Sequence, residues 1–182
     1  NCEKLKEVTL PSTLKKVHNL FYMCPELENV VLPENLETVT GYLFRECTKI
    51  TSVVLPASIR SMTGAPIVNF EQTETVSVAP GSEYLRVENG CLLTSDGVLL
   101  QAMEGFEIPD DVTSIGAYAF YAFTGLQEVP LPAGVTSIGN QAFAKCYELE
   151  TVNLPEGLLS IGALAFEFCK VLRTMDLPDT VT

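Results

Sequence analysis

Few residues in this chain of 182 residues combine the type and the spacing that enzyme chemistry requires. His18 is the only histidine, so the sequence offers no second imidazole for a metal site or a proton relay. Aspartate and glutamate total 23, but no pattern indicates the cleft and fixed separation that paired-carboxylate catalysis needs. Glycine-rich phosphate-binding motifs are also missing. We therefore expect no enzyme and no cofactor, and we expect His18 at the surface.

The six cysteines are the other candidates for chemistry, and their spacing favours burial over disulfide formation. Five of them recur at one position of a sequence repeat: Cys2, Cys24, Cys47, Cys146 and Cys169. Phe70 and Phe123 fill the same position elsewhere, which indicates an apolar column of free, buried thiols. Zinc binding is not expected, because no Cys-x-x-Cys pair occurs. Cys91 is out of register, and it is the one candidate for a pairing or reactive thiol.

Composition and charge exclude several classes of partner. Hydrophobic residues make up 47% of the chain and charged residues 19%, which is enough apolar material for a sizeable core. Lysine and arginine total 11 against 23 acidic residues, so the formal net charge is −12. Nucleic acids and anionic membranes both attract positive charge, and we expect neither as a partner. We expect no membrane insertion, because no apolar run reaches 18 residues. No charged segment followed by an apolar one has the pattern of a signal peptide.

Negative charge is concentrated in one part of the chain. Residues 61–144 carry one basic residue, Arg86, against ten acidic residues. Two interpretations stay open: a surface that attracts a basic partner or a divalent cation, and a solvated face that keeps the protein soluble. The spacing of Asp96, Asp110 and Asp111 does not match a calcium-binding loop.

The elements that position these residues follow a repeat of about 23 residues. Four prolines are spaced by 23 residues each: Pro109, Pro132, Pro155 and Pro178. Phenylalanines keep the same step in two series, which are Phe21 with Phe44, and Phe120 with Phe143 and Phe166. A fixed period of this length indicates a solenoid, in which each repeat forms one turn and buries its apolar side chains against its neighbours.

Within one repeat, the pattern predicts a strand and a helical turn on opposite sides. The segment Leu149-x-x-Val152-x-Leu154 alternates apolar and polar residues, which indicates a short strand with one face buried. Pro155 ends this strand because proline has no N–H for the ladder. We expect a bend at Ile161-Gly162 and a helical turn at Ala165-Phe166. The predicted fold class is therefore α/β, with short parallel strands on one face of the solenoid and short helical turns on the other.

One insertion interrupts the array. Ala79 and Pro109 occupy equivalent positions but lie seven residues further apart than one repeat. Asn89-Gly90 and Asp96-Gly97 separate apolar runs, and such dipeptides are the strongest short-range hairpin signals. We predict a small antiparallel β-meander at about residues 80–108, within a single solenoid domain that covers residues 1–182.

The repeat unit resembles the BspA-like leucine-rich repeats, a bacterial class with 23-residue units. The resemblance covers essentially the whole chain and rests on a string that recurs at 131–143 and 154–166: Ile108-Pro109-x-x-Val112-Thr113-Ser114-Ile115-Gly116-x-x-Ala119-Phe120. It implies a right-handed horseshoe solenoid, a secreted or cell-surface protein, and adhesion to host extracellular proteins or to other cells. The first half departs from the string, with Val17-His18 and Val39-Thr40 in place of Ile-Gly and with Ile67 in place of Phe.

The strands of a leucine-rich horseshoe line its concave face, and the residues that flank the buried positions point outward. By register these residues are Glu7, Thr9, Asn29, Val31, Ser52, Val54, Thr75, Ser77, Glu128, Pro130, Thr151, Asn153, Thr174 and Asp176. We treat this set as the candidate binding surface, with the acidic insertion as the alternative. Few of the residues are of the aromatic and arginine types that dominate binding hot spots.

Two roles remain open at this stage. The first is a recognition or adhesion module whose partner is a host or cell-surface protein or a glycan, and the second is a spacer that presents neighbouring domains. We expect a monomer. The chain begins and ends inside a repeat without a polar cap, so we also expect it to be part of a longer array.

Overall fold

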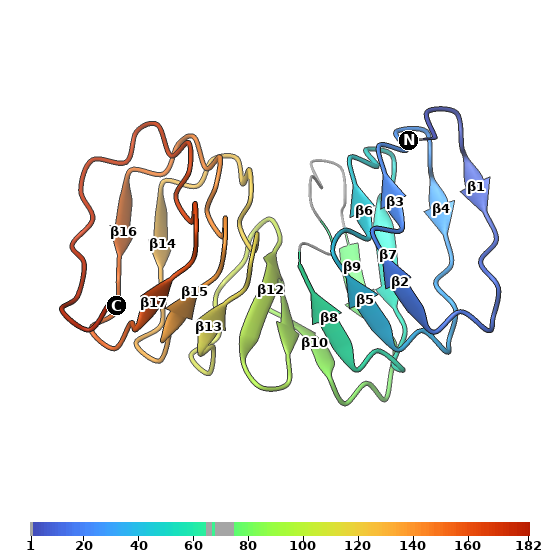
Figure 1. The fold of residues 1–182 in the computed structure, drawn as a ribbon, viewed down its shortest axis with the longest axis horizontal. Helices are drawn as coiled ribbons and strands as arrows, with labels where there is room; N and C mark the ends of the chain where they lie inside the picture. Colours follow the sequence, from blue (N-terminus) through green and yellow to red (C-terminus); the bar gives the residue numbers. More distant parts are fainter. Residues whose placement is uncertain (1, 65–66, 68–74) are drawn as a thin grey trace. The chain divides into compact units, whose positions relative to one another are not determined.

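The computed structural model describes residues 2–64, 67 and 75–182, and it divides into two compact units, Asn1–Val87 and Glu88–Thr182. The regular elements of the described residues are all β-strands (Figure 1). In each unit, successive turns of the chain place short strands side by side in parallel, one repeat apart. Each unit is therefore a stretch of parallel β-solenoid, as the 23-residue period predicts.

The described residues of the first unit form three rows of strands. One row consists of β1 (Glu7–Val8), β4 (Asn29–Val30), β7 (Ser52–Leu55) and β9 (Thr75–Val78). A second row consists of β2 (Lys16–His18), β5 (Thr38–Thr40) and β8 (Ser61–Thr63), and a third of β3 (Phe21–Tyr22) and β6 (Phe44–Arg45). Partner residues lie 22 or 23 positions apart, as in Val17 with Val39 and Val39 with Met62. β10 (Leu85–Glu88) ends at the boundary between the units.

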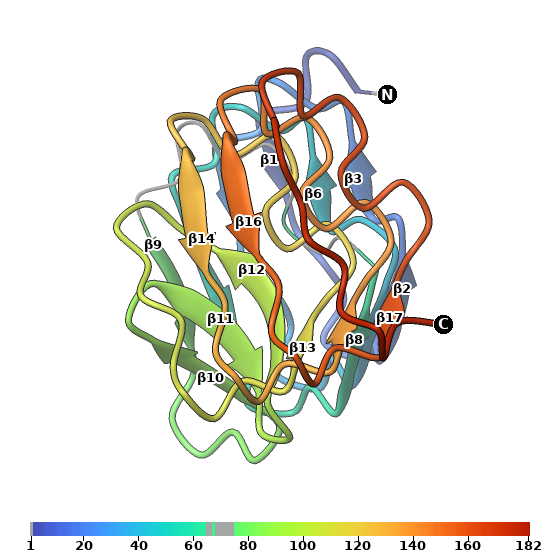
Figure 2. The same cartoon turned by 90° about the vertical axis from the view of Figure 1, so that its left-hand side faces the viewer.

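The second unit keeps the same period with two rows (Figure 2). One row consists of β14 (Glu128–Pro130) and β16 (Thr151–Asn153). The other begins with β11 (Cys91–Thr94) and β12 (Val98–Ala102) and continues with β13 (Ser114–Ile115), β15 (Ser137–Ile138) and β17 (Ser160–Ile161). Ser114, Ser137 and Ser160 are direct partners in this ladder, so the register advances by one repeat at every turn.

The predicted meander is confirmed in its turns and in its antiparallel pairing. Asn89 and Gly90 both have positive φ, 47° and 71°, and they connect β10 to β11. β11 then pairs antiparallel with β12, and the turn between them ends at Gly97, which also has positive φ. The Thr94 hydroxyl donates to Asp96 and accepts the Val98 N–H at 2.9 Å. β12 joins the parallel row through β13, so the meander starts the second unit's ladder.

The predicted helical turns are wrong: the described residues form no helix. In the second unit each turn contains two residues, four positions apart, with left-handed backbone conformation. These pairs are Tyr118 with Ala122, Gln141 with Lys145, and Leu164 with Phe168, all with φ between 52° and 63°. A right-handed helix cannot pass through such residues, so the segments are chains of tight turns.

Hydrogen bonds between turns explain why these segments do not coil into helices. The N–H groups of Tyr118, Phe120 and Ala122 donate to carbonyl oxygens 22 residues later, at 2.8–3.1 Å. The N–H groups between them donate to the carbonyl three residues earlier, as in Tyr121 to Tyr118 at 2.9 Å. Alternate backbone donors are therefore used by the neighbouring turn and are not available for i→i−4 bonds. The described residues belong to the all-β class and not to the predicted α/β class.

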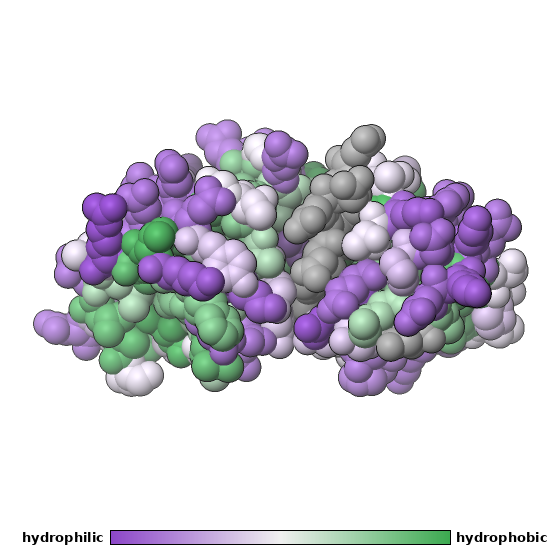
Figure 3. Space-filling view, turned by 90° about the horizontal axis from the view of Figure 1, so that it is seen from above, coloured by the Kyte–Doolittle hydropathy of each residue, from purple (hydrophilic) through white to green (hydrophobic). Residues whose placement is uncertain are grey.

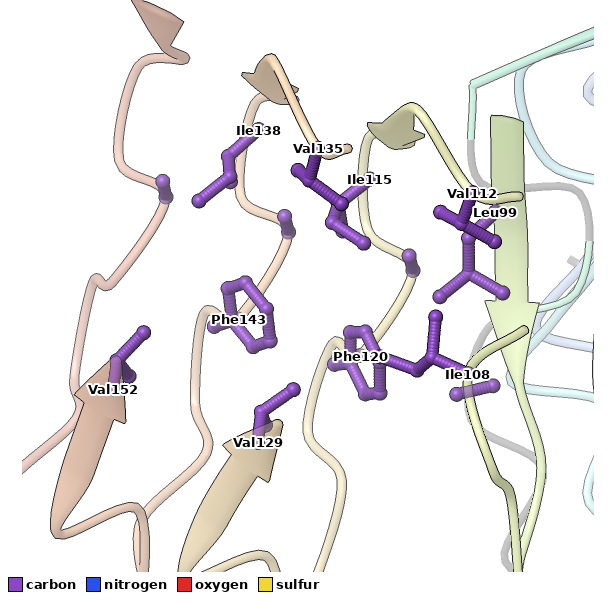
Figure 4. Close-up of a cluster of buried hydrophobic side chains, with 14 of the residues drawn as sticks. Leu99, Ile108, Val112, Ile115, Phe120, Val129, Val135, Ile138, Phe143 and Val152 are labelled. Carbon is purple, nitrogen blue, oxygen red and sulfur yellow. The ribbon is translucent and has the colours of Figure 1, made fainter. Parts of the chain in front are cut away.

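The core consists of side-chain columns, one residue per turn (Figure 4). Phe120 and Phe143 are fully buried and stack with ring centroids 4.8 Å apart, and Phe143 stacks on Phe166 at 5.3 Å. Phe21 and Phe44 form the matching pair in the first unit at 5.8 Å. The single file of phenylalanines that the period predicts is confirmed. Ile67 fills the same position in the first unit and is buried, while Phe70 lies outside the described residues.

Gly139 is expected to be essential because its backbone lies against the previous turn. A Cβ at this position would lie 2.5 Å from the Ala117 nitrogen and 2.7 Å from the Gly116 carbonyl carbon. We expect Gly139→Ala to lower the free energy of unfolding by about 2 kcal/mol, since the clashing atoms are backbone. Gly157→Ala is the matched control, because its Cβ would meet nothing closer than 3.9 Å. Urea unfolding followed by circular dichroism measures both, and equal effects would contradict the close approach.

Candidate recognition surface

Strands β1, β4, β7, β9, β14 and β16 direct alternate side chains inward and outward. We call their outward side, together with Thr9, Val31, Thr174 and Asp176 in the same register, the strand face. In β7, Val53 and Leu55 are 3% and 0% exposed, whereas Ser52 and Val54 point outward. All fourteen residues that the register marks as outward-facing are exposed: Glu7, Thr9, Asn29, Val31, Ser52, Val54, Thr75, Ser77, Glu128, Pro130, Thr151, Asn153, Thr174 and Asp176. The sequence therefore gives the orientation of these side chains correctly.

In the first unit the strand face consists of small and β-branched side chains in parallel ladders. Glu7 lies beside Asn29, Ser52 beside Thr75, and Val54 beside Ser77. Val31 and Val54 are 83% and 60% exposed, so this face carries two apolar side chains that the core does not use. The face offers the Glu7 carboxylate together with hydroxyl, amide and methyl groups.

In the second unit the strand face is more polar. Glu128 lies beside Thr151, and Thr151 forms an isolated bridge with Thr174 in the next turn. Asn153 lies beside Pro130, and its amide donates to a carboxylate oxygen of Glu128 at 3.0 Å. The hydrogen bond joins two exposed side chains of neighbouring turns.

The thiols are free, as predicted, but they are not all buried. Cys24, Cys47 and Cys146 are buried, Cys169 is half-buried and Cys2 is exposed. Burial raises the pKa of Cys47 to about 11 and that of Cys146 to about 12. The Cys146 thiol donates to the Phe120 carbonyl at 3.0 Å. The in-register thiols thus belong to the apolar column, with Cys2 as the exception at its first turn.

Cys91 is buried, and this corrects its selection as the candidate reactive thiol. It is 0% exposed, and its Sγ donates to the Glu107 carbonyl at 3.7 Å. Burial is the main cause that raises the pKa of this thiol to about 11, and the charge of Glu88 adds to it. Cys91 does not occupy the cysteine position of the repeat, because β11 belongs to the meander. All four residues of β11 are nevertheless buried.

His18 lies at the surface, as predicted, and both of its ring nitrogens have partners. Nε2 lies 2.9 Å from the Asn19 amide nitrogen, and Nδ1 lies 2.9 Å from the Thr40 hydroxyl. The Thr40 hydroxyl in turn donates to the Val17 carbonyl at 3.2 Å. This chain of hydrogen bonds ties two neighbouring turns together, which gives His18 a structural role. No group of three or more potential metal ligands comes together in the part of the chain that the structure describes.

Ion pairs connect neighbouring turns in the first unit. Lys49 contacts Glu26 at 2.8 Å and Glu28 at 3.8 Å, and Lys15 contacts Glu37 at 2.9 Å. The hydrogen bond from Lys49, together with its charge, lowers the pKa of Glu26. The second unit has three basic residues against thirteen acidic ones, so its surface is mainly negative. Of the acidic residues at 61–87, Glu71 and Glu74 lie outside the described residues.

Sequence reasoning missed a set of cation–tyrosine contacts outside the strand face. The Arg45 guanidinium lies over the Tyr22 and Tyr42 rings at 5.4 and 4.5 Å. In the second unit, Lys170 lies over Tyr147 at 4.8 Å. A tyrosine followed 23 residues later by a cation is the signal that would have found the Tyr22 and Tyr147 pairs. These contacts fix exposed side chains across turns.

The last turn of the second unit exposes apolar side chains where earlier turns are covered by the next one (Figure 3). Leu159, Leu164, Phe168, Val171 and Leu177 are between 42% and 58% exposed. Phe166 is half-buried, whereas Phe143, one turn earlier, is fully buried. A turn of this solenoid therefore buries its apolar side chains completely only when another turn packs on it. No segment in the described ranges forms a helix that could span a membrane.

Known proteins share this arrangement of parallel turns. Similar solved structures include the pneumococcal vaccine antigen PcpA, at 24% identity with a TM-score of 0.86 over 98% of this chain and 46% of that one. A leucine-rich cell-surface protein of Faecalibacterium prausnitzii matches at 25% identity with a TM-score of 0.80, over 100% of this chain and 50% of that one. A leucine-rich repeat protein of Eubacterium ventriosum matches at 16% identity with a TM-score of 0.61, over 93% and 72%.

The chain spans about half the length of the first two of these proteins. No curated protein matches the sequence. The family model described as the BspA type leucine-rich repeat region matches in six copies, over residues 1–90 and 100–182. The gap between the two matched ranges falls within the meander, which is the part of the chain that departs from the repeat. With the repeat, the parallel turns and the family model in agreement, this chain belongs to the BspA-type leucine-rich repeat family.

Proposed function

We propose that the chain is a non-enzymatic recognition module that binds a host or cell-surface protein or glycan through its strand face. The observation that carries this proposal is the exposure of all fourteen strand-face residues, ten of which lie on paired parallel strands. Successive strands lie about 4.8 Å apart, so the side chains form a regular grid that suits an extended partner. The exposed Val31 and Val54 support binding rather than mere solvation, since apolar side chains on a polar face gain from being covered.

Location at the bacterial cell surface, or secretion, is part of this proposal. Its support is family membership and the likeness to a Faecalibacterium prausnitzii protein that is described as a leucine-rich cell-surface protein. A surface module that binds other molecules acts as an adhesin, and the chain contributes one segment of that activity.

A structural spacer is the second candidate function, and one observation favours it. The strand-face residues include no tyrosine, tryptophan or arginine, the types that dominate binding hot spots. A spacer would present neighbouring domains and would bind nothing through this face. The two functions differ in whether strand-face substitutions change binding.

Surface plasmon resonance against immobilised collagen, laminin and fibronectin tests the recognition function. We expect the purified chain to bind at least one of them. We expect two strand-face variants to weaken that binding at least tenfold: Thr75→Arg with Ser77→Arg in the first unit, and Glu128→Lys in the second. Each variant changes the size and the charge of side chains on the strand face. Thr13→Arg with Ser95→Arg is the matched control for the first pair, and Asp110→Lys makes the same change of charge as Glu128→Lys. All three control positions are exposed and lie outside the strand face.

The same series separates the strand face from the acidic insertion. Glu104→Lys lies in the insertion and is expected to leave binding within about twofold of wild type. Loss of binding in this variant alone would transfer the recognition function to the insertion. Absence of binding to every immobilised protein and to host-cell surfaces would instead favour the spacer.

A further inference from the structure

The hydrogen bonds between β2 and β5 fix where the proton of the His18 ring lies. The Thr40 hydroxyl has a single hydrogen, which it donates to the Val17 carbonyl at 3.2 Å. Towards the Nδ1 atom of His18, 2.9 Å away, the same oxygen can therefore only accept. It follows that the neutral imidazole carries its proton on Nδ1.

The orientation of the Asn19 amide makes the other ring nitrogen an acceptor. The Oδ1 atom of Asn19 accepts the Tyr42 N–H at 2.9 Å, which identifies the remaining amide atom as the nitrogen. This nitrogen lies 2.9 Å from Nε2 of His18, and because it can only donate, Nε2 supplies the lone pair. Every donor in this set of bonds meets an acceptor when His18 is neutral.

A second proton on His18 does not fit this set of bonds. On Nε2 the proton would point at the amide hydrogens of Asn19, so that two donors would face each other. Turning the amide over would present its oxygen to His18, but the Tyr42 N–H would then lose its acceptor. Protonation of His18 therefore costs one of the two hydrogen bonds that the Asn19 side chain makes.

The backbone around Asn19 confines its side chain. Asn19 has a φ of 50°, and Gly41 in the next turn has a φ of 69°. A Cβ at position 41 would collide with the Oδ1 atom of Asn19, so the amide lies directly against the Gly41 backbone. The Asn19 N–H also donates to the Thr40 carbonyl at 3.2 Å. The amide cannot move aside without breaking the contact between the two turns.

The charged groups around His18 do not favour an imidazolium. Glu37, which directly precedes β5, is bonded to Lys15 at 2.9 Å. Within the described strands of this row, the other outward-facing positions carry no carboxylate, and they are Lys16 on β2, Thr38 and Thr40 on β5, and Ser61 and Thr63 on β8. The charge of Lys16 opposes a further positive charge beside it.

We propose that His18 is a pH-sensitive lock between two neighbouring turns, which opens when the imidazole takes up a proton. In the closed state Asn19 holds the Tyr42 backbone, and the Tyr42 ring lies beneath the Arg45 guanidinium at 4.5 Å. In the open state the Tyr42 N–H loses its acceptor, and residues 41–42 are released from the preceding turn. Imidazoles change charge between about pH 5 and 8, so mild acid is the signal. The lock is independent of the recognition function.

Amide hydrogen exchange in the whole chain tests the lock. Rates measured by 15N–1H NMR are divided by those of an unstructured chain at the same pH, which gives a protection factor for each amide. Between pH 7.5 and pH 5 we expect the protection of the Tyr42 amide to fall at least threefold. The Ala163 amide is the matched control, because it donates to the Asn140 Oδ1 atom at 2.8 Å and that asparagine follows a glycine instead of a histidine. Its protection should stay constant.

A variant and a second spectrum complete the test. His18→Phe keeps a ring that takes up no proton, so its Tyr42 protection should not depend on pH. Because His18 is the only histidine, 15N spectra report its tautomer directly, and they should show the proton on Nδ1 at pH 7.5. A proton on Nε2, unchanged Tyr42 protection at pH 5, or an equal fall at Ala163 or in His18→Phe would each overturn the inference.

Discussion

Replacing Phe143 by alanine is expected to lower the free energy of unfolding by about 4 kcal/mol, the largest loss expected from a single side chain here. Phe143 is fully buried and stacks between Phe120 and Phe166, with ring centroids 4.8 and 5.3 Å away. The substitution leaves a cavity between two turns that cannot collapse, because the backbone hydrogen bonds fix the distance between turns. Urea unfolding followed by far-ultraviolet circular dichroism measures the change.

Phe168→Ala is the matched control for this prediction. The substitution removes the same atoms as Phe143→Ala, because both replace phenylalanine by alanine. Phe168 lies in the next turn, and its side chain is 55% exposed. We expect it to change the free energy of unfolding by less than about 1 kcal/mol. Comparable losses in the two variants would show that the stacked column does not contribute the stability that its burial implies.

Thiol labelling is expected to separate the six cysteines by rates that differ at least a hundredfold. Only the thiolate form of a cysteine reacts. The pKa of Cys47 and of Cys91 is raised from an ordinary 9.0 to about 11, so the fraction of each that is thiolate at pH 8 falls about a hundredfold. For Cys146, with a pKa of about 12, the reduction is about a thousandfold. Exposed Cys2 should react first, followed by half-buried Cys169. Labelling with a chromogenic disulfide reagent gives the rates.

Two controls complete the labelling experiment. Cys2→Ser should remove the fast phase, and urea should make all remaining thiols react together. The same pKa values give a direction for alkaline stability. The unfolded thiols lose their protons near pH 9, whereas the folded ones hold them to about pH 11 or 12, so stability present below pH 9 is lost as the pH rises through that window. A fast phase that is lost in Cys91→Ser would contradict the burial of Cys91.

The sequence predicts the period, the columns and the outward-facing residues because all three follow from residue type and spacing. Pro132, Phe143 and Gly139 return at fixed intervals, and each has a packing reason that its chemistry alone reveals. Once Val152 is assigned to the interior, the period of two along a strand places Thr151 and Asn153 outside. No contact information is needed for that step.

The prediction of helical turns failed for a reason that residue types do not encode. Tyr118, Ala122, Gln141 and Lys145 have no strong preference for positive φ, and alanine, glutamine and lysine are good helix formers. Their conformation follows from hydrogen bonds to the next turn, which exist only when the turns are stacked. Cys91 illustrates the same limit, since its burial depends on how the meander packs and not on its register.

The central claim is that equivalent side chains of successive repeats lie in single file inside the solenoid, which forces the strand-face residues outward. Nuclear Overhauser effects between the aromatic rings test it directly in solution, using a chain in which only phenylalanine rings are protonated. The account predicts cross-peaks between Phe120 and Phe143 and between Phe143 and Phe166, with none between Phe120 and Phe166. A cross-peak between Phe120 and Phe166, or the loss of either neighbouring one, would contradict the claim.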